Sequence, residues 1–133
     1  MRKQIKQRKF GRKKDQRKAL LRGLASDLIL RERVQTTLAK AKEIKPEVEK
    51  LVTRAAKDDL ATARYLASRL SKKAAQKARK ELGPKFAGRP GGYLRIIKTD
   101  QKRKDGAAKA LIEFVKQPPI QQEAQQPQAV VKK

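Results

Sequence analysis

The run from residue 83 to residue 98 constrains the fold most, because it combines a helix stop, a glycine-rich basic loop and a strand. Gly83 and Pro84 follow an alanine-rich segment. Glycine often stands just past a helix C-terminus, and proline cannot continue a helix, so we expect the helix to end at Leu82. The β-branched residues between positions 93 and 99 then predict a strand.

The loop between this helix and this strand surrounds Arg89 with small or rigid residues, namely Gly88, Pro90, Gly91 and Gly92. Glycines allow the backbone to approach a partner closely. The formal net charge is +24, from 37 Lys and Arg against 13 Asp and Glu. A chain this basic needs a polyanion to neutralise its self-repulsion, so we expect the loop to meet phosphate.

Several kinds of chemistry are excluded by what the sequence lacks. The 133 residues are enough for one domain, and they include no cysteine and no histidine. This removes disulfides, zinc-thiolate sites and the commonest general base at neutral pH. Neither phosphate-binding glycine motif, Gly-x-x-x-x-Gly-Lys-Ser/Thr or Gly-x-Gly-x-x-Gly, is present. We therefore expect no enzyme, no metal, no cofactor and no small-molecule substrate, and a soluble cytoplasmic protein without a membrane span.

Apolar residues at helical spacing predict the helices. The clearest period, Leu38 to Ala55, predicts the main core helix, in which Pro46 causes either a kink or a restart. An earlier helix is expected from an N-cap at Asp15 to about residue 31, with Gly23 marking close packing. The remaining expected elements are a strand at 33–37, a helix capped by Asp59 with Leu60, Ala63, Leu66, Ala67 and Leu70 inward, and a helix that is capped by Ser71 and runs to Leu82.

The last part of the chain predicts a hairpin and a tail. Asp105 and Gly106 favour a tight turn, and residues 110–115 should pair antiparallel with residues 94–99. The Gln- and Pro-rich segment 117–133 is expected to be disordered. The fold class is α+β, with a small three-stranded sheet packed on helices. The domain organisation is a basic RNA-binding arm (1–14), an α+β domain (15–116) and the tail (117–133).

The first fourteen residues carry eight basic side chains and no acid, so they can lie along phosphates but cannot bury a core. Gly11 supplies a bend, and the ring of Phe10 could stack on a base. The predicted RNA contacts of the arm and first helix are Arg2, Lys3, Arg8, Lys9, Phe10, Arg12, Lys13, Lys14, Arg17, Lys18 and Arg22. The lysine-rich face of the helix before Leu82 is either a solvated surface or a second RNA contact.

Other classes of binding protein share this charge. A zinc finger would need cysteine and histidine, and a helix-turn-helix would need a tight glycine-containing turn between two helices. A nucleoid-associated or other general nucleic-acid-binding protein remains the alternative, and a membrane-surface protein would need a free apolar helix face. Cations spread over arm, helices and loop favour recognition of RNA shape and backbone.

Three runs, at residues 19–25, 36–43 and 82–96, resemble the family of the seventeenth protein of the bacterial large ribosomal subunit. The likeness covers about residues 8 to 116. It implies a fold of helix, strand, three helices and two strands. It also implies a structural role in the ribosome, bound to large-subunit ribosomal RNA and neighbouring ribosomal proteins near the exit of the nascent-chain tunnel.

The resemblance also suggests site residues. The family's basic run corresponds to Arg8, Lys9, Gly11 and Arg12, and its Thr-Thr-Leu turn to Thr36, Thr37 and Leu38. Its glycine loop corresponds to Lys85, Phe86, Arg89, Gly91, Gly92 and Tyr93. Lys40 and Arg95, which flank these segments, complete the predicted RNA-binding set.

Overall fold

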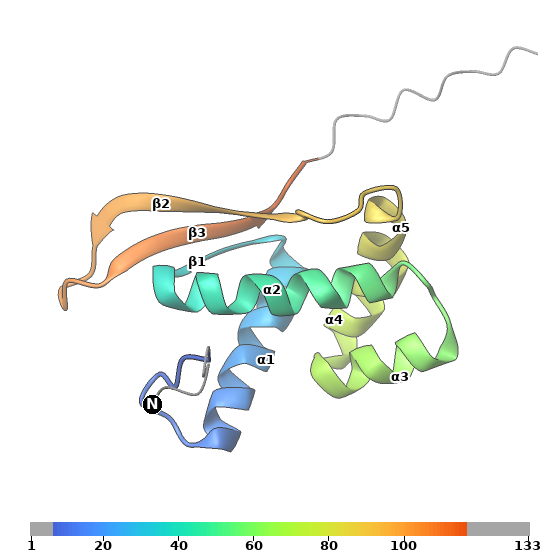
Figure 1. The fold of residues 1–133 in the computed structure, drawn as a ribbon, viewed down its shortest axis with the longest axis horizontal. Helices are drawn as coiled ribbons and strands as arrows, with labels where there is room; N and C mark the ends of the chain where they lie inside the picture. The colour runs from blue at the N-terminus through green and yellow to red at the C-terminus, as the bar shows by residue number, and fades with distance from the viewer. Residues whose placement is uncertain (1–6, 117–133) are drawn as a thin grey trace, which may run out of the picture.

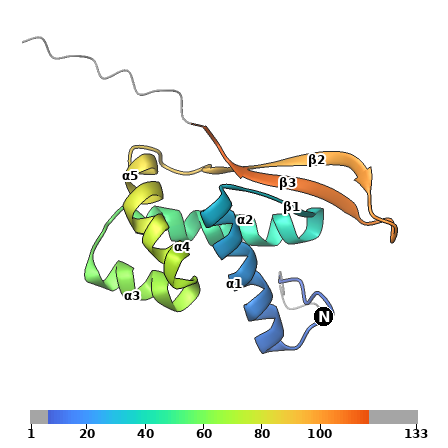
Figure 2. The ribbon, with the colours of Figure 1, turned by 180° about the vertical axis from the view of Figure 1, so that it is seen from behind.

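The computed structural model describes residues 7–116 (Figures 1 and 2). The predictions for Arg2, Lys3 and the other residues of segment 1–6, and for the tail 117–133, lie outside the described residues. In chain order the elements are α1 (Lys14–Arg31), β1 (Arg33–Thr37), α2 (Leu38–Ala55), α3 (Leu60–Arg69), α4 (Lys72–Lys77), the π-helical turn η1 (Ala78–Leu82), α5 (Gly83–Phe86), β2 (Leu94–Lys102) and β3 (Ala108–Phe114). The α+β class is confirmed.

Helix α1 begins slightly earlier than its sequence predicts. Lys13, not Asp15, occupies the N-cap position, and its backbone N–H donates to the Gln16 side chain at 3.4 Å. Asp15 instead lies in the first turn, where a carboxylate favours the helix dipole. The close packing expected at Gly23 is wrong, because a Cβ there would meet no atom within 4 Å.

Helix α2 is the centre of the core, as its apolar period predicts. One face is buried along its whole length, through Ala41, Ile44, Val48, Leu51, Val52 and Ala55. Pro46 lies inside an unbroken helix, so the restart is wrong. Pro46 is exposed, so the carbonyl that loses its N–H partner lies on the solvent side of the helix.

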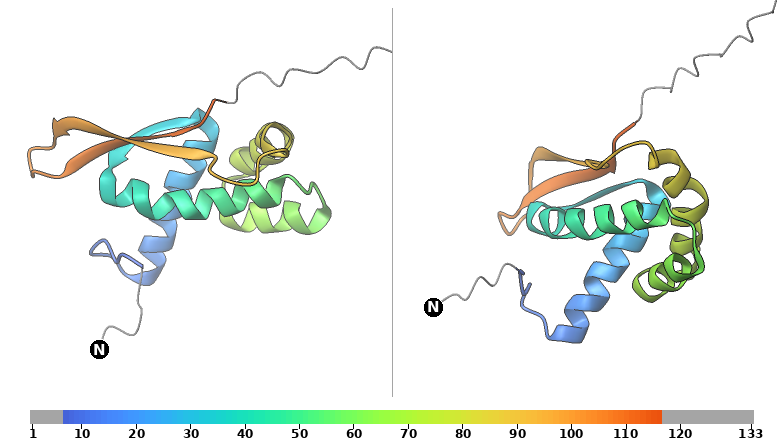
Figure 3. Two further views of the ribbon diagram at one scale, coloured as in Figure 1. Left: turned by 45° about the horizontal axis from the view of Figure 1, so that its top comes forward. Right: turned by 45° about the vertical axis from the view of Figure 1, so that its right-hand side comes forward.

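The sheet is antiparallel with strand order β1-β3-β2. Its register pairs Val34 with Ile112 and Ile96 with the same Ile112, so the predicted pairing of the last two strands is confirmed. Both strands run further toward the hairpin than predicted, and Gly106 has the positive φ of 74° that its turn requires. Helices α1 and α2 cover one face of the sheet and leave the other face open (Figure 1; Figure 3, left).

The small helices differ more from expectation. Both predicted caps are confirmed, since Asp59 accepts from the Thr62 N–H at 2.6 Å and Ser71 accepts from the Ala74 N–H at 3.4 Å. In α3, however, Leu60 and Ala67 are exposed, and the buried residues are Leu66, Thr62 and the C-capping Leu70. The inward face of α3 is therefore shifted from the predicted one.

The predicted helix stop at residue 83 is wrong. Gly83 has helical angles (φ −56°, ψ −58°), and the chain continues through a wide π-turn into α5, which ends at Phe86. Pro84 stands in the first turn of α5, where its missing N–H is tolerated. Part of the clash that proline imposes on a preceding helical residue involves that residue's Cβ, and Gly83 has none.

Candidate nucleic-acid interface

Most cations of the described part have no acidic partner within it. Residues 7–116 contain 32 Lys and Arg against 12 Asp and Glu. Ion pairs within that segment occupy seven of the cations and six of the carboxylates. A large cationic excess therefore faces outward, which is the electrostatic pattern of a protein that binds a polyanion.

The described part of the arm folds back toward α2. Arg8 lies 3.9 Å from the Glu43 carboxylate, and positive φ angles at Phe10 (52°) and Gly11 (61°) turn the chain between Arg8 and α1. The Arg12 guanidinium donates to the Phe10 carbonyl at 2.9 Å, which closes this turn. The bend predicted at Gly11 is therefore present, and the Phe10 ring is half-buried beside it.

The predicted cations of α1 have mixed environments. Lys14 and Lys18 are exposed, whereas Arg17 donates to the Arg12 carbonyl at 3.3 Å. Arg22 donates to the Leu70 carbonyl at 3.0 Å and so fixes α1 to the end of α3. Arg22 thus has a structural contact that its position on the polar side of a helix did not reveal.

The glycine loop, residues 87–93, is held by its own hydrogen bonds. The Arg89 Nε donates to the Gly91 carbonyl at 3.1 Å, and the Tyr93 hydroxyl donates to the Arg89 carbonyl at 3.0 Å. That hydroxyl also accepts from Thr53 of α2 at 3.2 Å. Gly92 has φ of 64°, which an L side chain rarely adopts. Contacts within the chain itself therefore define the shape of this loop.

The two aromatic rings predicted to contact RNA in this region belong to the core. Phe86 is 2% exposed and Tyr93 is 3% exposed, and their ring centroids lie 5.2 Å apart. Phe114 of β3 completes the cluster at 5.7 Å from Phe86. Because these rings are packed against one another, we leave Phe86 and Tyr93 out of the proposed interface.

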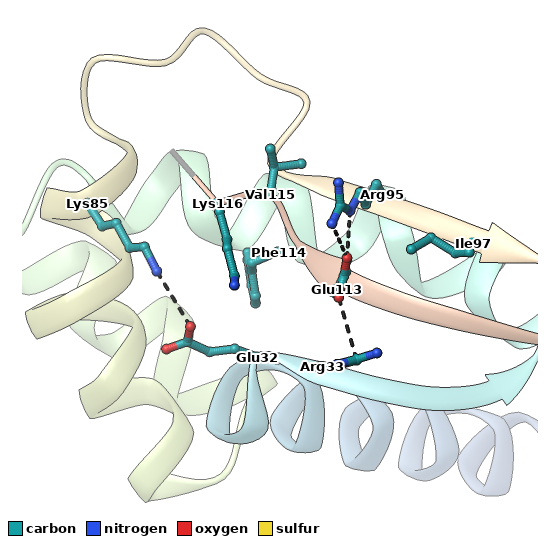
Figure 4. A pocket seen from close by; sticks show the side chains of 9 residues that line it. All are labelled: Glu32, Arg33, Lys85, Arg95, Ile97, Glu113, Phe114, Val115 and Lys116. Atoms are coloured by element: carbon teal, nitrogen blue, oxygen red, sulfur yellow. Dashed lines mark hydrogen bonds and ion pairs between the residues drawn. The ribbon is translucent and has the colours of Figure 1, made fainter. Parts of the chain in front are cut away.

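Two more predicted cations, Lys85 and Arg95, are paired with acids (Figure 4). Lys85 Nζ lies 3.5 Å from Glu32, and Arg95 lies 2.5 Å from Glu113, which also pairs with Arg33 at 3.6 Å. These five charged residues line a hollow of about 400 Å³, and the other lining residues are Ile97, Phe114, Val115 and Lys116. Cations and carboxylates alternate here, so this surface attracts an anion less strongly than the count of its cations implies.

Glu32 joins three elements near this hollow. It adopts the left-handed conformation (φ 61°) at the end of α1, and its carboxylate lies 3.0 Å from Lys77 of α4. The hydrogen bond from Lys77 holds the pKa of Glu32 below its ordinary value, the charge of Lys85 adds to this, and partial burial opposes it. Lys77 also donates to the Leu30 carbonyl at 2.9 Å, so it is not the purely outward residue that the helical pattern indicates.

A second hollow gathers predicted residues with three that the sequence analysis missed, Gln35, Arg103 and Lys109. Its volume is about 350 Å³, and its lining is Gln35, Thr36, Thr37, Lys40, Arg103 and Lys109. Arg103 and Lys109 bracket the hairpin turn, a stretch to which the sequence analysis assigned only a structural role. The available signal was the basic run Lys98, Lys102, Arg103, Lys104 and Lys109 on either side of the turn.

The predicted site residues fall into two separate groups. The described part of the arm, the start of α2 and the hairpin tip lie toward one end of the molecule (Figure 1). The glycine loop lies with α5 toward the other end, at the opposite end of β2 (Figure 3). The structure therefore does not bring the arm and the glycine loop together into one site.

Two further observations concern the same described segment. None of the helices between residues 7 and 116 combines the length and the apolar character needed to cross a membrane. Nor does that segment gather three or more Asp or Glu side chains into a cluster that could hold a metal ion.

Comparison with known proteins identifies the family. The sequence profile described as ribosomal protein L17 matches residues 20–115. The large ribosomal subunit protein bL17 of Nautilia profundicola is 50% identical over 113 residues, which cover 81% of this chain and 93% of that protein. The protein of the same name from Sulfurihydrogenibium sp. is 49% identical over 120 residues, covering 89% and 99%. The one from Thermomicrobium roseum is 51% identical over 109 residues, covering 81% and 93%.

The chain belongs to the ribosomal protein L17 family.

Family membership confirms the resemblance inferred from the three sequence runs. The L17 profile begins inside α1 and ends just past β3, so it spans most of the folded body, including the glycine loop and the cationic hairpin. The first nineteen residues, which include the whole basic arm, precede the matched span.

Proposed function

We propose that the protein is a structural component of the bacterial large ribosomal subunit that binds large-subunit ribosomal RNA mainly through phosphate contacts, without catalysis. Its relatives carry the name of large-subunit proteins, which supports the assignment to that particle. The cationic excess of the described residues is the single observation that carries the proposed RNA binding, because the acids of the same segment cannot neutralise it.

Two surfaces with different properties would make these contacts. The end with the arm, the start of α2 and the hairpin offers cations of which only Arg8 forms an ion pair within the described segment. The glycine loop offers Arg89 on a backbone fixed by the Tyr93 hydroxyl. Because the surfaces lie at opposite ends of β2 (Figure 1), the protein could join two RNA segments that would otherwise repel each other.

Lysine and arginine would provide the free energy through counterion release. Each phosphate that a cation neutralises releases condensed ions, so affinity falls as salt rises. Such contacts position a protein on RNA shape and carry little base-by-base information. The expected place near the nascent-chain tunnel exit rests on the family resemblance alone.

A salt titration tests the proposal. As the salt concentration rises, the affinity of the full chain for large-subunit ribosomal RNA should fall steeply, and the plot of log affinity against log salt should be linear. In a separate test, the protein should stay with large subunits pelleted after a high-salt wash. Equal affinity for duplex DNA and absence from washed subunits would favour the nucleoid-associated alternative. Cross-linking from an exposed residue such as Lys104 to neighbouring components tests the position near the tunnel exit.

A further inference from the structure

We infer that the hollow between β1, the start of α2 and the hairpin binds one backbone phosphate of the RNA, held jointly by Lys40, Arg103 and Lys109. This inference rests on the proposed function and names the ligand group at one place on its surface. The hollow holds about 350 Å³, near the lower end of ligand-binding cavities (about 300 to 1,000 Å³). That volume suits a phosphate group with its adjoining sugar.

The three cations come from segments that the fold holds rigidly next to one another. Thr37, the last residue of β1, pairs with Lys109 of β3. The Thr99 hydroxyl donates to the Lys109 carbonyl at 3.1 Å, and the Arg103 N–H donates to the Ala107 carbonyl at 3.1 Å. Lys40 lies in the first turn of α2. Sheet, turn and helix therefore fix the three backbones, so that only the side chains themselves must be ordered when a ligand binds.

The charge of the hollow selects an anion. Its lining contains three cations and no carboxylate, and none of the three cations forms an ion pair with any described residue. Like charges around one cavity repel one another, and a shared anion removes that repulsion. The hydroxyls of Thr36 and Thr37 and the Gln35 amide add neutral donors. The hollow that contains Glu32 and Glu113 has a smaller excess, with four cations against two carboxylates.

The hollow also lacks what other ligands would require. All six lining residues are polar, so an apolar side chain or an inserted base would gain little from burial there. A diester phosphate accepts from several donors at once, and both lysine and arginine bind it well. Because the three cations line one hollow, the inference is one phosphate shared by them, and not three separate phosphates.

Salt dependence distinguishes a shared phosphate from independent contacts. Each lost phosphate contact lowers the slope of log affinity against log salt by about 0.7 to 0.9. If the hollow holds one phosphate, the triple variant Lys40→Gln, Arg103→Gln, Lys109→Gln should lower the slope by about 0.7 to 0.9 in total. Each single variant should weaken binding roughly tenfold at fixed salt, and the double variants little more than the singles.

The experiment uses the full chain, an rRNA fragment of the large subunit and salt titrations of each variant. Lys102→Gln is the matched control, because Lys102 is exposed on the same hairpin and does not line the hollow. Its effect should add to that of the triple variant, and no variant should lower the thermal unfolding midpoint, because removing one of several like charges relieves repulsion.

The outcomes separate this inference from the proposed function. Additive losses from the three substitutions would overturn it, because they would indicate three separate phosphates. An unchanged slope in the triple variant would also overturn it and would leave this surface to a protein neighbour or to solvent. If the unmodified chain shows no salt-dependent affinity for the RNA, the proposed function itself fails.

Discussion

The carbonyl oxygen of Ala55 lies 2.6 Å from the position that a Cβ on Gly83 would occupy. Ala55 ends α2, and Gly83 begins α5, so this contact sets how closely the two helices pack. A real Cβ cannot come this near to a backbone oxygen, and both backbones are inside helices that cannot shift alone. Gly83 is thus required by packing, although its sequence context indicated a helix stop.

Replacing Gly83 by alanine should therefore destabilise the protein. Gly83→Ala should lower the free energy of unfolding by about 2 kcal/mol, the usual size of an overpacking effect. Urea denaturation followed by circular dichroism measures this. Gly88→Ala is the control, since a Cβ there meets nothing within 4 Å, and it should change stability by less than about 1 kcal/mol. Equal effects of the two substitutions would contradict the packing argument.

Gly23 is the opposite case. It lies inside α1, has helical neighbours on both sides and has open space where a Cβ would stand. Gly23→Ala should raise the free energy of unfolding by about 0.5 to 1 kcal/mol, because glycine loses more backbone entropy in a helix than alanine does. Ala19→Gly, at an exposed position of the same helix, should lower stability by a similar amount. A destabilising Gly23→Ala would indicate a close neighbour at that position.

The sequence predicted the parts of the fold that depend on local pattern. The apolar period of α2, the caps at Asp59 and Ser71, and the hairpin turn at Gly106 are each determined by a few neighbouring residues. The end of the last helix could not be predicted in this way. It depends on the distant carbonyl of Ala55, which favours a glycine for reasons unrelated to the local chain.

In the candidate interface, too, the sequence predicted what depends on local residues and missed what depends on distant contacts. The sequence identified the cationic segments, since charge is visible in composition. It could not show that Glu113, from the adjacent strand β3, would neutralise Arg95, or that Arg103 and Lys109 would converge on Lys40. Those relationships depend on strand register, and shifting the register by one residue would place the same side chains on the other face.

The ion pairs of Glu32 should make stability depend on pH. Its pKa in the folded protein is below the ordinary value of 4.5, so its contribution is present above about pH 4.5 and is lost as the pH falls through the folded-state pKa. Glu32→Gln should lower the free energy of unfolding at pH 7 by at most about 1 kcal/mol, because the carboxylate is partly exposed. Near pH 3 the difference should shrink markedly. Urea denaturation at both pH values measures it.

Variants of Lys77 and Lys85 distinguish the contributions of the two cations that face Glu32. Lys77→Met should reduce the pH dependence more than Lys85→Met, since Lys77 lies at 3.0 Å and Lys85 at 3.5 Å. Glu81, which lies 3.9 Å from Lys77, is more exposed and should contribute less. If Glu32→Gln costs the same free energy at pH 3 and pH 7, the ion pairs do not explain the stability.

Arg89 should contribute to RNA binding more than to folding. Its side chain is half-buried and bonds only within the loop, to the Gly91 carbonyl, whereas its backbone carbonyl accepts from the Tyr93 hydroxyl. Arg89→Ala should lower the salt slope of RNA binding by about 0.7 to 0.9 while changing the free energy of unfolding by less than about 1 kcal/mol. Tyr93→Phe keeps the cation, so it should leave the salt slope of RNA binding nearly unchanged and lower the free energy of unfolding instead. Loss of the cooperative melt in Arg89→Ala would show that Arg89 is structural.

The arm should account for a large share of the electrostatic affinity. Removing residues 1–12 leaves Lys13 as the N-cap of α1, so the folded body should keep its thermal midpoint. The deletion removes six basic side chains, and if each meets a phosphate the salt slope should fall by about four to five. Arg8 is already 3.9 Å from Glu43, so it should contribute least. A full-length chain with those six residues changed to glutamine should match the deletion, because charge and not chain length determines the slope. An unchanged slope in both would remove the arm from the binding mechanism and leave the affinity to the glycine loop, the hairpin and α2.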